Sequence, residues 1–160
     1  MLKVPAVDEQ HSSKSSQAAS PPRILIVEGE AVIRYDVRQQ LQALGYTVVG
    51  EACSGQEAVF LTGRLCPDLV LMDIGLGPGM DGIATARAIR EHQPLPVVFL
   101  SADAADDILD RAMLAEPYGY MLKPFSEREL RAVLKTTLDK NKADVREADW
   151  CSAARPFWTT

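Results

Sequence analysis

The sequence lacks the features that mark several classes of protein. It has only three cysteines, an odd number without metal-ligand spacing, which fits a reduced, cytoplasmic setting. No segment approaches the roughly 20 apolar residues of a membrane span, and the N-terminus shows no signal-peptide pattern. The 17 basic residues form no cluster and are outnumbered by 22 acidic ones, for a net charge of −5. Direct nucleic-acid binding is therefore not expected, because neutralisation of phosphates supplies most of that affinity.

The chain of 160 residues predicts one domain with a polar segment at each end. Residues 1–22 are rich in Ser, Gln and Ala and close with two prolines, a composition that predicts a disordered leader. Residues 23–138 carry apolar periodicity and form the predicted domain. Residues 139–160 lack clear periodicity but hold both tryptophans. We interpret them as a tail or linker stub, with docking on this domain or a partner as the alternative. No stretch of DNA-binding or enzymatic size follows residue 138, which favours a stand-alone domain.

Five short apolar runs alternate with five segments of helical periodicity. The runs are too short for helices and are rich in β-branched and other apolar residues, which is typical of strands. The predicted strands are residues 23–28, 46–51, 69–73, 96–101 and 118–123. Two of the helices begin with the form of a capping box, at Ser54-x-x-Glu57 and Ser126-x-x-Glu129. This alternation predicts the α/β class, with right-handed βαβ units and a doubly wound parallel sheet.

Polar residues end four of the predicted strands. The central run, 69–72, is apolar throughout, as in strands buried on both faces, and it ends in Asp73. Glu28, Ser101 and Lys123 end the first, fourth and fifth strands. Each alone is ordinarily a helix cap, a turn residue or a solvated side chain. Because open α/β sheets bind ligands at the carboxyl ends of their strands, four such groups together favour a shared site.

These residue types suit phosphoryl transfer assisted by a divalent cation. Two neighbouring carboxylates, here Glu28 and Asp73, disfavour each other's ionisation unless a cation relieves the repulsion. Mg²⁺ suits such a site because it binds through one or two carboxylates, keeps several waters and contacts phosphate oxygens. Asp73 would then be the ionised nucleophile, with an acyl phosphate as the product. The Ser101 hydroxyl and the Lys123 ammonium are the donors that a phosphoryl group requires.

Five stretches carry a more specific pattern. They are Ile24-Leu-Ile-Val-Glu28, Leu71-Met-Asp73, Met80-Asp-Gly82, Phe99-Leu-Ser-Ala102 and Tyr120-Met-Leu-Lys-Pro-Phe125. Together they resemble the receiver domain of two-component response regulators, over about residues 23–138. The resemblance implies a flavodoxin-like (βα)5 fold with strand order 2-1-3-4-5. It also implies a signalling protein that receives and slowly loses a phosphoryl group, rather than a turnover enzyme.

The resemblance assigns roles to individual residues. Asp73 would accept a phosphoryl group from a sensor histidine kinase or a phosphotransfer protein. Lys123 would pair with that group, and Ser101 would reorient toward it. Tyr120, three residues before the lysine, corresponds to the aromatic switch residue. The peptide bond between Lys123 and Pro124 would be cis, which costs little because the trans preference of X-Pro bonds is weak.

The implied metal site departs from the family's pattern. The resemblance implies Mg²⁺ held by Glu28, Asp73 and the backbone carbonyl of Gly75. The family normally has two adjacent acids after the first strand, and the second is a direct ligand; here that position is Gly29. Glu28 could reach the metal with its longer side chain, or Glu30 could turn inward. The two alternatives are a weak but working phosphorylation site and an atypical, non-phosphorylated receiver that acts as a protein-interaction adaptor.

The output is expected to pass through protein contacts. Phosphorylation would change the face formed by the helix of residues 103–115, the strand of 118–123 and the last helix, and this face would control a downstream protein partner. A homodimer is a further option for the same chain.

Two other functions share parts of this pattern. Phosphatases with an aspartate nucleophile commonly carry a second Asp two residues later as the general acid, but that position is Gly75 here. The segment Gly77-Pro-Gly-Met-Asp-Gly82 satisfies the G-x-G-x-x-G pattern of nucleotide-binding proteins. It follows the third strand, contains a proline and has no acid about 20 residues on at the end of a following strand, so the match is weak.

Overall fold

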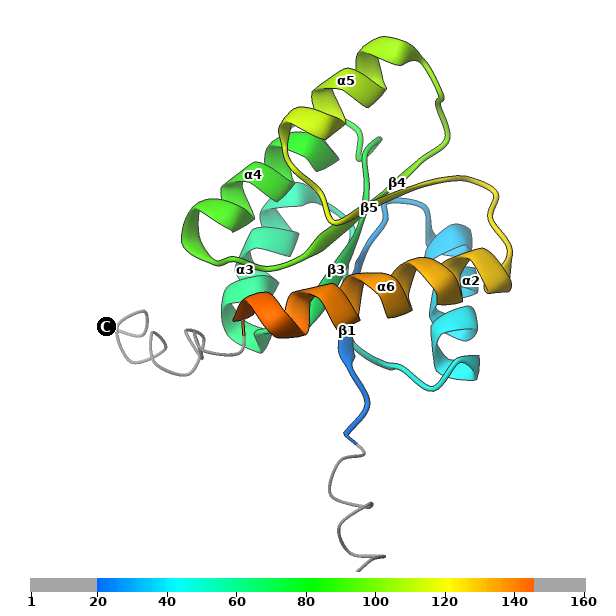
Figure 1. The fold of residues 1–160 in the computed structure, drawn as a ribbon. Coiled ribbons are helices and arrows are strands. Elements are labelled where there is room, and N and C mark those ends of the chain that lie inside the picture. The colour runs from blue at the N-terminus through cyan, green and yellow to red at the C-terminus, as the bar shows by residue number, and fades with distance from the viewer. Residues whose placement is uncertain (1–19, 146–160) are drawn as a thin grey trace, which may run out of the picture.

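The computed structural model describes residues 20–145, which form a parallel five-stranded sheet with helices on both faces (Figure 1). The strand order is β2-β1-β3-β4-β5. The strands are β1 (Arg23–Val27), β2 (Thr47–Ala52), β3 (Leu69–Asp73), β4 (Val97–Ser101) and β5 (Gly119–Leu122). The predicted flavodoxin-like α/β fold with strand order 2-1-3-4-5 is therefore confirmed.

The helices of the described chain divide between the two faces of the sheet. They are α2 (Ala31–Ala43), α3 (Gly55–Leu65), α4 (Gly82–His92), α5 (Asp106–Leu114) and α6 (Glu127–Val145). α2 and α6 cover one face, and α3, α4 and α5 cover the other. This is the doubly wound arrangement that alternating strands and helices predict.

The sheet separates two apolar cores, because successive residues of a strand point to opposite faces. On one face, Ile26 of β1 belongs to a cluster with Leu41 of α2 and Leu134 of α6. On the other face, Val27 of β1 belongs to a cluster with Ile89 of α4. Burial of an aliphatic side chain of this size contributes roughly 1.5–3 kcal/mol. Both faces need apolar side chains, so the strands are apolar at nearly every position.

Both predicted capping boxes are present. At the start of α3, the Glu57 N–H donates to Ser54 Oγ at 3.2 Å, and the Cys53 N–H donates to the Glu57 carboxylate at 2.9 Å. At the start of α6, the Glu129 N–H donates to Ser126 Oγ at 3.1 Å, and the Ser126 N–H donates to Glu129 Oε1 at 2.9 Å. Each box satisfies N–H groups that have no partner inside the helix, which determines where these two helices begin.

The last helix is longer than its apolar periodicity predicts. The periodic apolar residues end at Leu138, but α6 continues to Val145. A helix that has already formed adds residues at little cost, and Lys and Ala in this stretch favour helix without needing a buried face. The remaining tail, residues 146–160, and the predicted leader up to residue 19 lie outside the described residues. Within residues 20–145, no helix combines the length and the apolar character that a membrane crossing requires.

The strand register places the predicted site residues at one edge of the sheet. Asp73, the last residue of β3, lies beside Leu100 of β4, and Ser101 follows as the last residue of β4. Glu28 and Lys123 come directly after β1 and β5. All four residues therefore lie where the parallel strands end, the edge at which open α/β sheets bind ligands.

Candidate functional site

Three of the predicted site residues meet at one ammonium group. Lys123 Nζ donates to Glu28 Oε1 at 2.8 Å and to Asp73 Oδ1 at 3.1 Å. The lysine is 95 and 50 positions away from these residues along the chain. The side chains of Glu28, Asp73 and Lys123 are 1%, 7% and 14% exposed. The site is therefore a buried cation between two buried carboxylates.

The loop after β3 holds Asp73 in place. The Gly75 N–H donates to Asp73 Oδ1 at 3.2 Å, and the Gly82 N–H donates to the Ile74 carbonyl at 2.9 Å. The start of α4 approaches β3 so closely that a Cβ on Gly82 would lie 2.7 Å from Ile74 Cα and would also collide with the Asp73 carbonyl. Only glycine fits at this position, and its absence of a side chain lets the loop close tightly beside the phosphoacceptor candidate.

Backbone hydrogen bonds position the other two members of the site. The Glu28 N–H donates to the Ala52 carbonyl at 3.0 Å, which extends the pairing of β1 with β2 by one residue. The Lys123 N–H donates to the Ser101 carbonyl at 2.8 Å at the end of β5. The peptide bond that follows Lys123 is cis, as the family resemblance implied.

The pKa values of Glu28 and Lys123 are both raised, for different reasons. Burial raises the pKa of Glu28, and the charge of Asp73 adds to that rise, while Lys123 opposes it. Burial alone would lower the pKa of Lys123, but the hydrogen bonds and charges of Glu28 and Asp73 outweigh it and raise that pKa. The lysine is therefore fully protonated at neutral pH.

Ser101 and Tyr120 lie near this network without joining it. The buried Ser101 hydroxyl donates to the Asp103 carbonyl at 2.9 Å and accepts from the Asp103 N–H at 3.1 Å, so it is engaged by its own loop. The Tyr120 ring packs against the core cluster under α3, α4 and α5, and its buried hydroxyl has no hydrogen-bond partner among the described residues. The side chains of these two residues of the implied switch thus form no hydrogen bond with the Asp73 carboxylate or the Lys123 ammonium.

The loop after β1 contributes one acid to the site rather than two. Glu30 is exposed and reaches the site only through its backbone N–H, which donates to Glu28 Oε2 at 3.2 Å. A Cβ on Gly29 would meet nothing closer than the Cys53 and Leu76 carbonyl oxygens, at 3.8 and 3.9 Å. A side chain is therefore sterically allowed at position 29, and its absence is a property of this sequence rather than a demand of the fold.

The donors at the site fit Mg²⁺ in their chemistry. Between residues 20 and 145 no three His, Cys, Asp or Glu side chains are grouped as a metal site. Mg²⁺ nevertheless needs only one or two carboxylates and keeps several waters, and Glu28 and Asp73 supply two carboxylates. Asp73 Oδ2 also accepts no hydrogen bond from the described residues, since both of the bonds to this carboxylate reach Oδ1. The predicted ligands are therefore sufficient in kind, with one acid fewer than the family's pattern.

Asp81, in the loop between β3 and α4, was not predicted as a functional residue. Asp81 caps α4, accepting from the Ala84 N–H at 2.8 Å, and its other oxygen lies 2.9 Å from Arg111 Nη2 of α5. Burial alone would raise the pKa of Asp81, but these two partners hold that pKa below its usual value. An Asp just before a helical pattern is a detectable capping signal, whereas nothing in the sequence pairs it with an arginine 30 residues later.

Comparison with known proteins identifies relatives along most of the chain. Residues 24–154 match the family of response regulator receiver domains. The transcriptional regulatory protein PdtaR of Mycobacterium tuberculosis is 41% identical over 125 residues, which are 78% of this chain and 60% of that protein. A probable transcriptional regulator, ycf27 of Guillardia theta, is 38% identical over 124 residues, which are 76% of this chain and 47% of that protein. The chain thus spans only about half to three-fifths of the length of these relatives.

Solved structures give the same result. The signal receiver domain of a modulated diguanylate cyclase from Desulfovibrio desulfuricans G20 has a TM-score of 0.74 and 33% identity, covering 78% of this chain and 99% of that one. The N-terminal domain of a response regulator/sensory box/GGDEF 3-domain protein from Carboxydothermus hydrogenoformans has a TM-score of 0.71 and 39% identity, covering 77% and 98%. In both cases nearly all of the solved domain corresponds to this chain.

Proposed function

Because the chain belongs to the response regulator receiver domain family, we propose that Asp73 is its phosphoacceptor and that a sensor histidine kinase or a phosphotransfer protein is the donor. Members of this family are signalling proteins of two-component systems rather than turnover enzymes, and this chain is one of them. The observation that supports the proposal is the buried contact of Lys123 Nζ with Asp73 Oδ1 at 3.1 Å. The proposal places the chain in the cytoplasm.

The two oxygens of Asp73 have different roles in this proposal. Oδ1 accepts from Lys123 Nζ and the Gly75 N–H, whereas Oδ2 accepts from no described residue. Oδ2 is therefore the attacking oxygen. Its lone pair forms the O–P bond while the bond between phosphorus and the donor's imidazole nitrogen breaks, and the imidazole leaves with that electron pair. Lys123 stays protonated throughout, because its pKa is raised, and its ammonium pairs with the new phosphoryl oxygens.

Mg²⁺ is the cofactor of this proposal. Glu28, Asp73 and the backbone carbonyl of Gly75 would hold it, and the Glu30 carboxylate would add a ligand if its exposed side chain turned inward. When bound, the metal supplies neutralising charge for the phosphoryl oxygens. Since Gly29 provides no ligand, we expect the affinity to be low for this family.

The proposed switch connects the site to α5, β5 and α6. To reach a phosphoryl group on Asp73, Ser101 must give up its two hydrogen bonds with Asp103, in the loop that leads to α5. Tyr120 is on the neighbouring strand β5, and its unpartnered hydroxyl loses little if the ring changes position. A rearrangement of these residues would alter the face of α5, β5 and α6, to which a downstream protein or a second copy of the chain would bind.

The first test is intact mass spectrometry after incubation with acetyl phosphate, with and without Mg²⁺. We expect one added phosphoryl group in the wild type and none in Asp73→Asn. An adduct that forms equally in the Asn variant would contradict the assignment of Asp73. A complete absence of adduct, together with no binding of beryllofluoride, would contradict phosphorylation itself.

Two observations favour the adaptor alternative. Gly29 provides no carboxylate, and the ammonium of Lys123 already neutralises much of the charge of Glu28 and Asp73. A receiver of this kind would bind its partner without phosphate. Partner binding that is equal in wild type and Asp73→Asn, with or without acetyl phosphate, would favour this alternative.

A further inference from the structure

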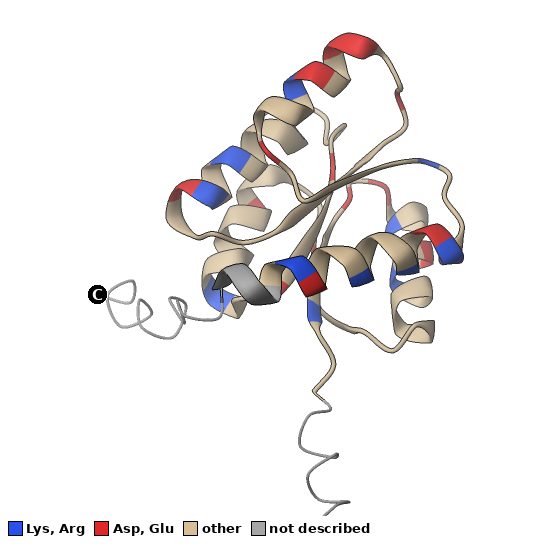
Figure 2. Cartoon of the chain, in the orientation of Figure 1, with Lys and Arg blue, Asp and Glu red and all other residues tan. Residues whose placement is uncertain are grey.

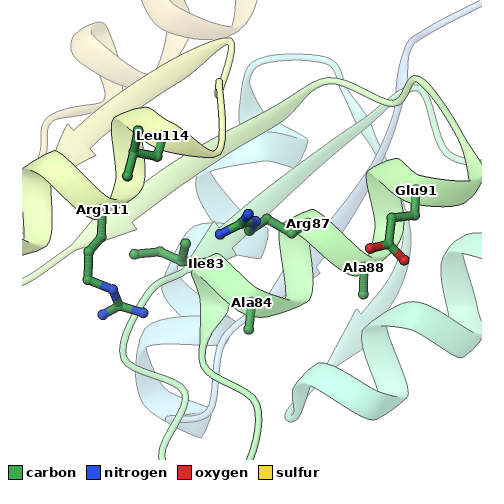
Figure 3. A pocket seen from close by; sticks show the side chains of 7 residues that line it. All are labelled: Ile83, Ala84, Arg87, Ala88, Glu91, Arg111 and Leu114. Atoms are coloured by element: carbon green, nitrogen blue, oxygen red, sulfur yellow. The ribbon is translucent and has the colours of Figure 1, made fainter.

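We propose that the groove between α4 and α5 binds a short segment of a partner protein through one carboxylate and one apolar side chain. The groove has a volume of about 410 Å³ and is lined by side chains of these two helices, and Asp73 is not among its lining residues (Figure 3). The function proposed above makes no use of it. Binding is expected in the unphosphorylated chain, so the two proposals can fail separately.

The floor of the groove is apolar and shallow. Ala84 and Ala88 lie one turn apart on α4, and their small side chains leave space above the helix. Ile83 adds a nearly buried apolar surface beside them. On the side of α5, Leu114 borders the groove and is 76% exposed. Covering an exposed leucine with an apolar side chain of a partner removes that surface from water, which favours binding.

Two arginines make one end of the groove positive. Arg87 forms no hydrogen bond or ion pair within residues 20–145. Figure 3 shows its guanidinium directed away from Glu91, toward the end of the groove at Ile83. Arg111 lies at that same end; it pairs with Asp81, but its side chain is 54% exposed and its other N–H groups find no acceptor in the described chain. A carboxylate placed there would meet the Arg87 guanidinium and those N–H groups of Arg111 that do not bond to Asp81.

The local charge contrasts with the charge of the whole protein. The chain carries a net charge of −5, whereas the side chains that line the groove include two arginines and one glutamate. Figure 2 shows blue bands on both α4 and α5, with red bands toward the start of α5. A carboxylate of a partner is attracted to the arginine end of the groove although the chain as a whole is acidic, so complementarity of charge favours an acidic ligand at this place.

The dimensions of the groove fit a peptide of about four residues. Its lining on α4 runs from Ile83 to Glu91, which is about 12 Å at 1.5 Å per residue. An extended chain covers that length in about four residues. Glu91 disfavours a second acid at the far end, so the carboxylate of the ligand belongs at Arg87. Since the groove is bordered by exposed side chains on both helices, it suits a peptide laid along it better than an enclosed small molecule.

The test is an NMR titration of the ¹⁵N-labelled full chain with acetyl-Leu-Glu-Ala-Leu-amide, whose single charge is the glutamate. We expect amide shifts confined to residues 83–91 of α4 and 111–114 of α5. Arg87→Gln and Leu114→Ser both alter exposed side chains, and each should weaken binding about threefold to fivefold. The peptide with glutamine in place of glutamate should lose affinity to the same extent. Arg128→Gln on α6 is the matched control, since it removes an equal charge elsewhere, and it should leave the affinity unchanged.

Three outcomes would overturn the proposal. The first is no shift in these segments at millimolar peptide. The second is a set of shifts centred on another surface. The third is an affinity that survives both Arg87→Gln and the glutamine peptide, because binding would then be apolar adsorption without recognition of the carboxylate.

Discussion

Lys123 Nζ lies closer to Glu28 Oε1, at 2.8 Å, than to Asp73 Oδ1, at 3.1 Å. The nearer partner of Lys123 is therefore Glu28, which follows β1, and not the phosphoacceptor candidate Asp73, which ends the adjacent strand β3. Moving the ammonium toward a phosphoryl group on Asp73 would lengthen the contact with Glu28. The contact with Glu28 therefore stabilises the unphosphorylated state of the site relative to the phosphorylated one. A phosphoryl group shifts the population between these states only by the difference in its interaction with them.

We expect Lys123→Met to destabilise the fold by about 3 kcal/mol at pH 7. The substitution leaves two buried carboxylates facing each other without a cation, and the loss of one partner from a buried ion pair costs about this much. Urea unfolding monitored by circular dichroism measures the change. Lys135→Met, at an exposed position of α6 without an ion pair in the described chain, is the control and should change stability by less than about 0.5 kcal/mol. Equal effects of the two substitutions would show that the network contributes nothing.

We expect the stability of the wild type to fall relative to Glu28→Gln as the pH rises above 4.5, the ordinary value for a glutamate pKa. The pKa of Glu28 is raised by burial and by Asp73, so the folded state holds this proton more tightly than the unfolded state does. Its contribution to stability is therefore fully present below pH 4.5 and is lost as the pH rises through the folded pKa. Urea midpoints measured between pH 4 and 7 in both proteins give the difference.

Asp73→Asn provides the control for this pH dependence. The charge of Asp73 is one cause of the raised pKa of Glu28, so its removal should move the window of falling stability toward lower pH. A difference between wild type and Glu28→Gln that stays constant from pH 4 to 7 would show that Glu28 has an ordinary pKa in the folded protein.

We expect Gly29→Asp to raise the affinity for Mg²⁺ by about tenfold, since affinity for a hard cation follows the number of charged oxygen ligands. The position has room for a side chain, and its backbone is not in the left-handed region. Calorimetric titration with MgCl₂ measures the affinity. Gly63→Asp, on the exposed side of α3 with nothing near its Cβ, adds the same charge away from the site and should leave the affinity unchanged. An equal gain in both variants would indicate general electrostatic attraction instead of a new ligand.

We expect Gly82→Ala to destabilise the fold by about 2–3 kcal/mol, because its Cβ would enter the space of the Asp73 and Ile74 backbone, where little can move. Gly75→Ala is the matched substitution in the same loop. Nothing lies within 4 Å of its Cβ and its φ is not positive, so its effect should be within about 1 kcal/mol of zero. Thermal unfolding of the two variants tests the difference, which would vanish if the loop can move away from α4.

The fold and the meeting of the site residues were predictable from local patterns. Runs that are apolar at every position, alternating with helical periodicity, leave few arrangements other than a doubly wound parallel sheet, and such a sheet brings Glu28, Asp73 and Lys123 to one edge. Side-chain bonds depend on rotamers and loop paths instead. Only the structure could therefore reveal that Lys123 lies closer to Glu28 than to Asp73, and that the Ser101 hydroxyl is hydrogen-bonded to the Asp103 backbone.

The extent of α6 and the pairing of Asp81 with Arg111 were not predicted from the sequence, and each has a physical reason. Hydrophobic periodicity locates a helix by its regularly spaced apolar residues, so it cannot detect the end of α6 beyond Leu138, where the sequence has no such spacing. Capping residues are recognised by their position before a helix, which is how Asp81 could be noticed. Its second partner, Arg111, lies on a different element, and only the packing of α5 against α4 brings the two together.

Both ends of α4 are tied to the same end of α5. Arg111, in the last turn of α5, pairs with Asp81 at the start of α4, and Arg90, in the last turn of α4, donates to the Ala115 carbonyl at 3.1 Å and to the Glu116 carbonyl. The N-terminal turn of α5 has no such tie within the described residues. We therefore expect a change in the turn after Ser101 to displace the acidic N-terminal end of α5 more than its C-terminal end, which these bonds hold against α4.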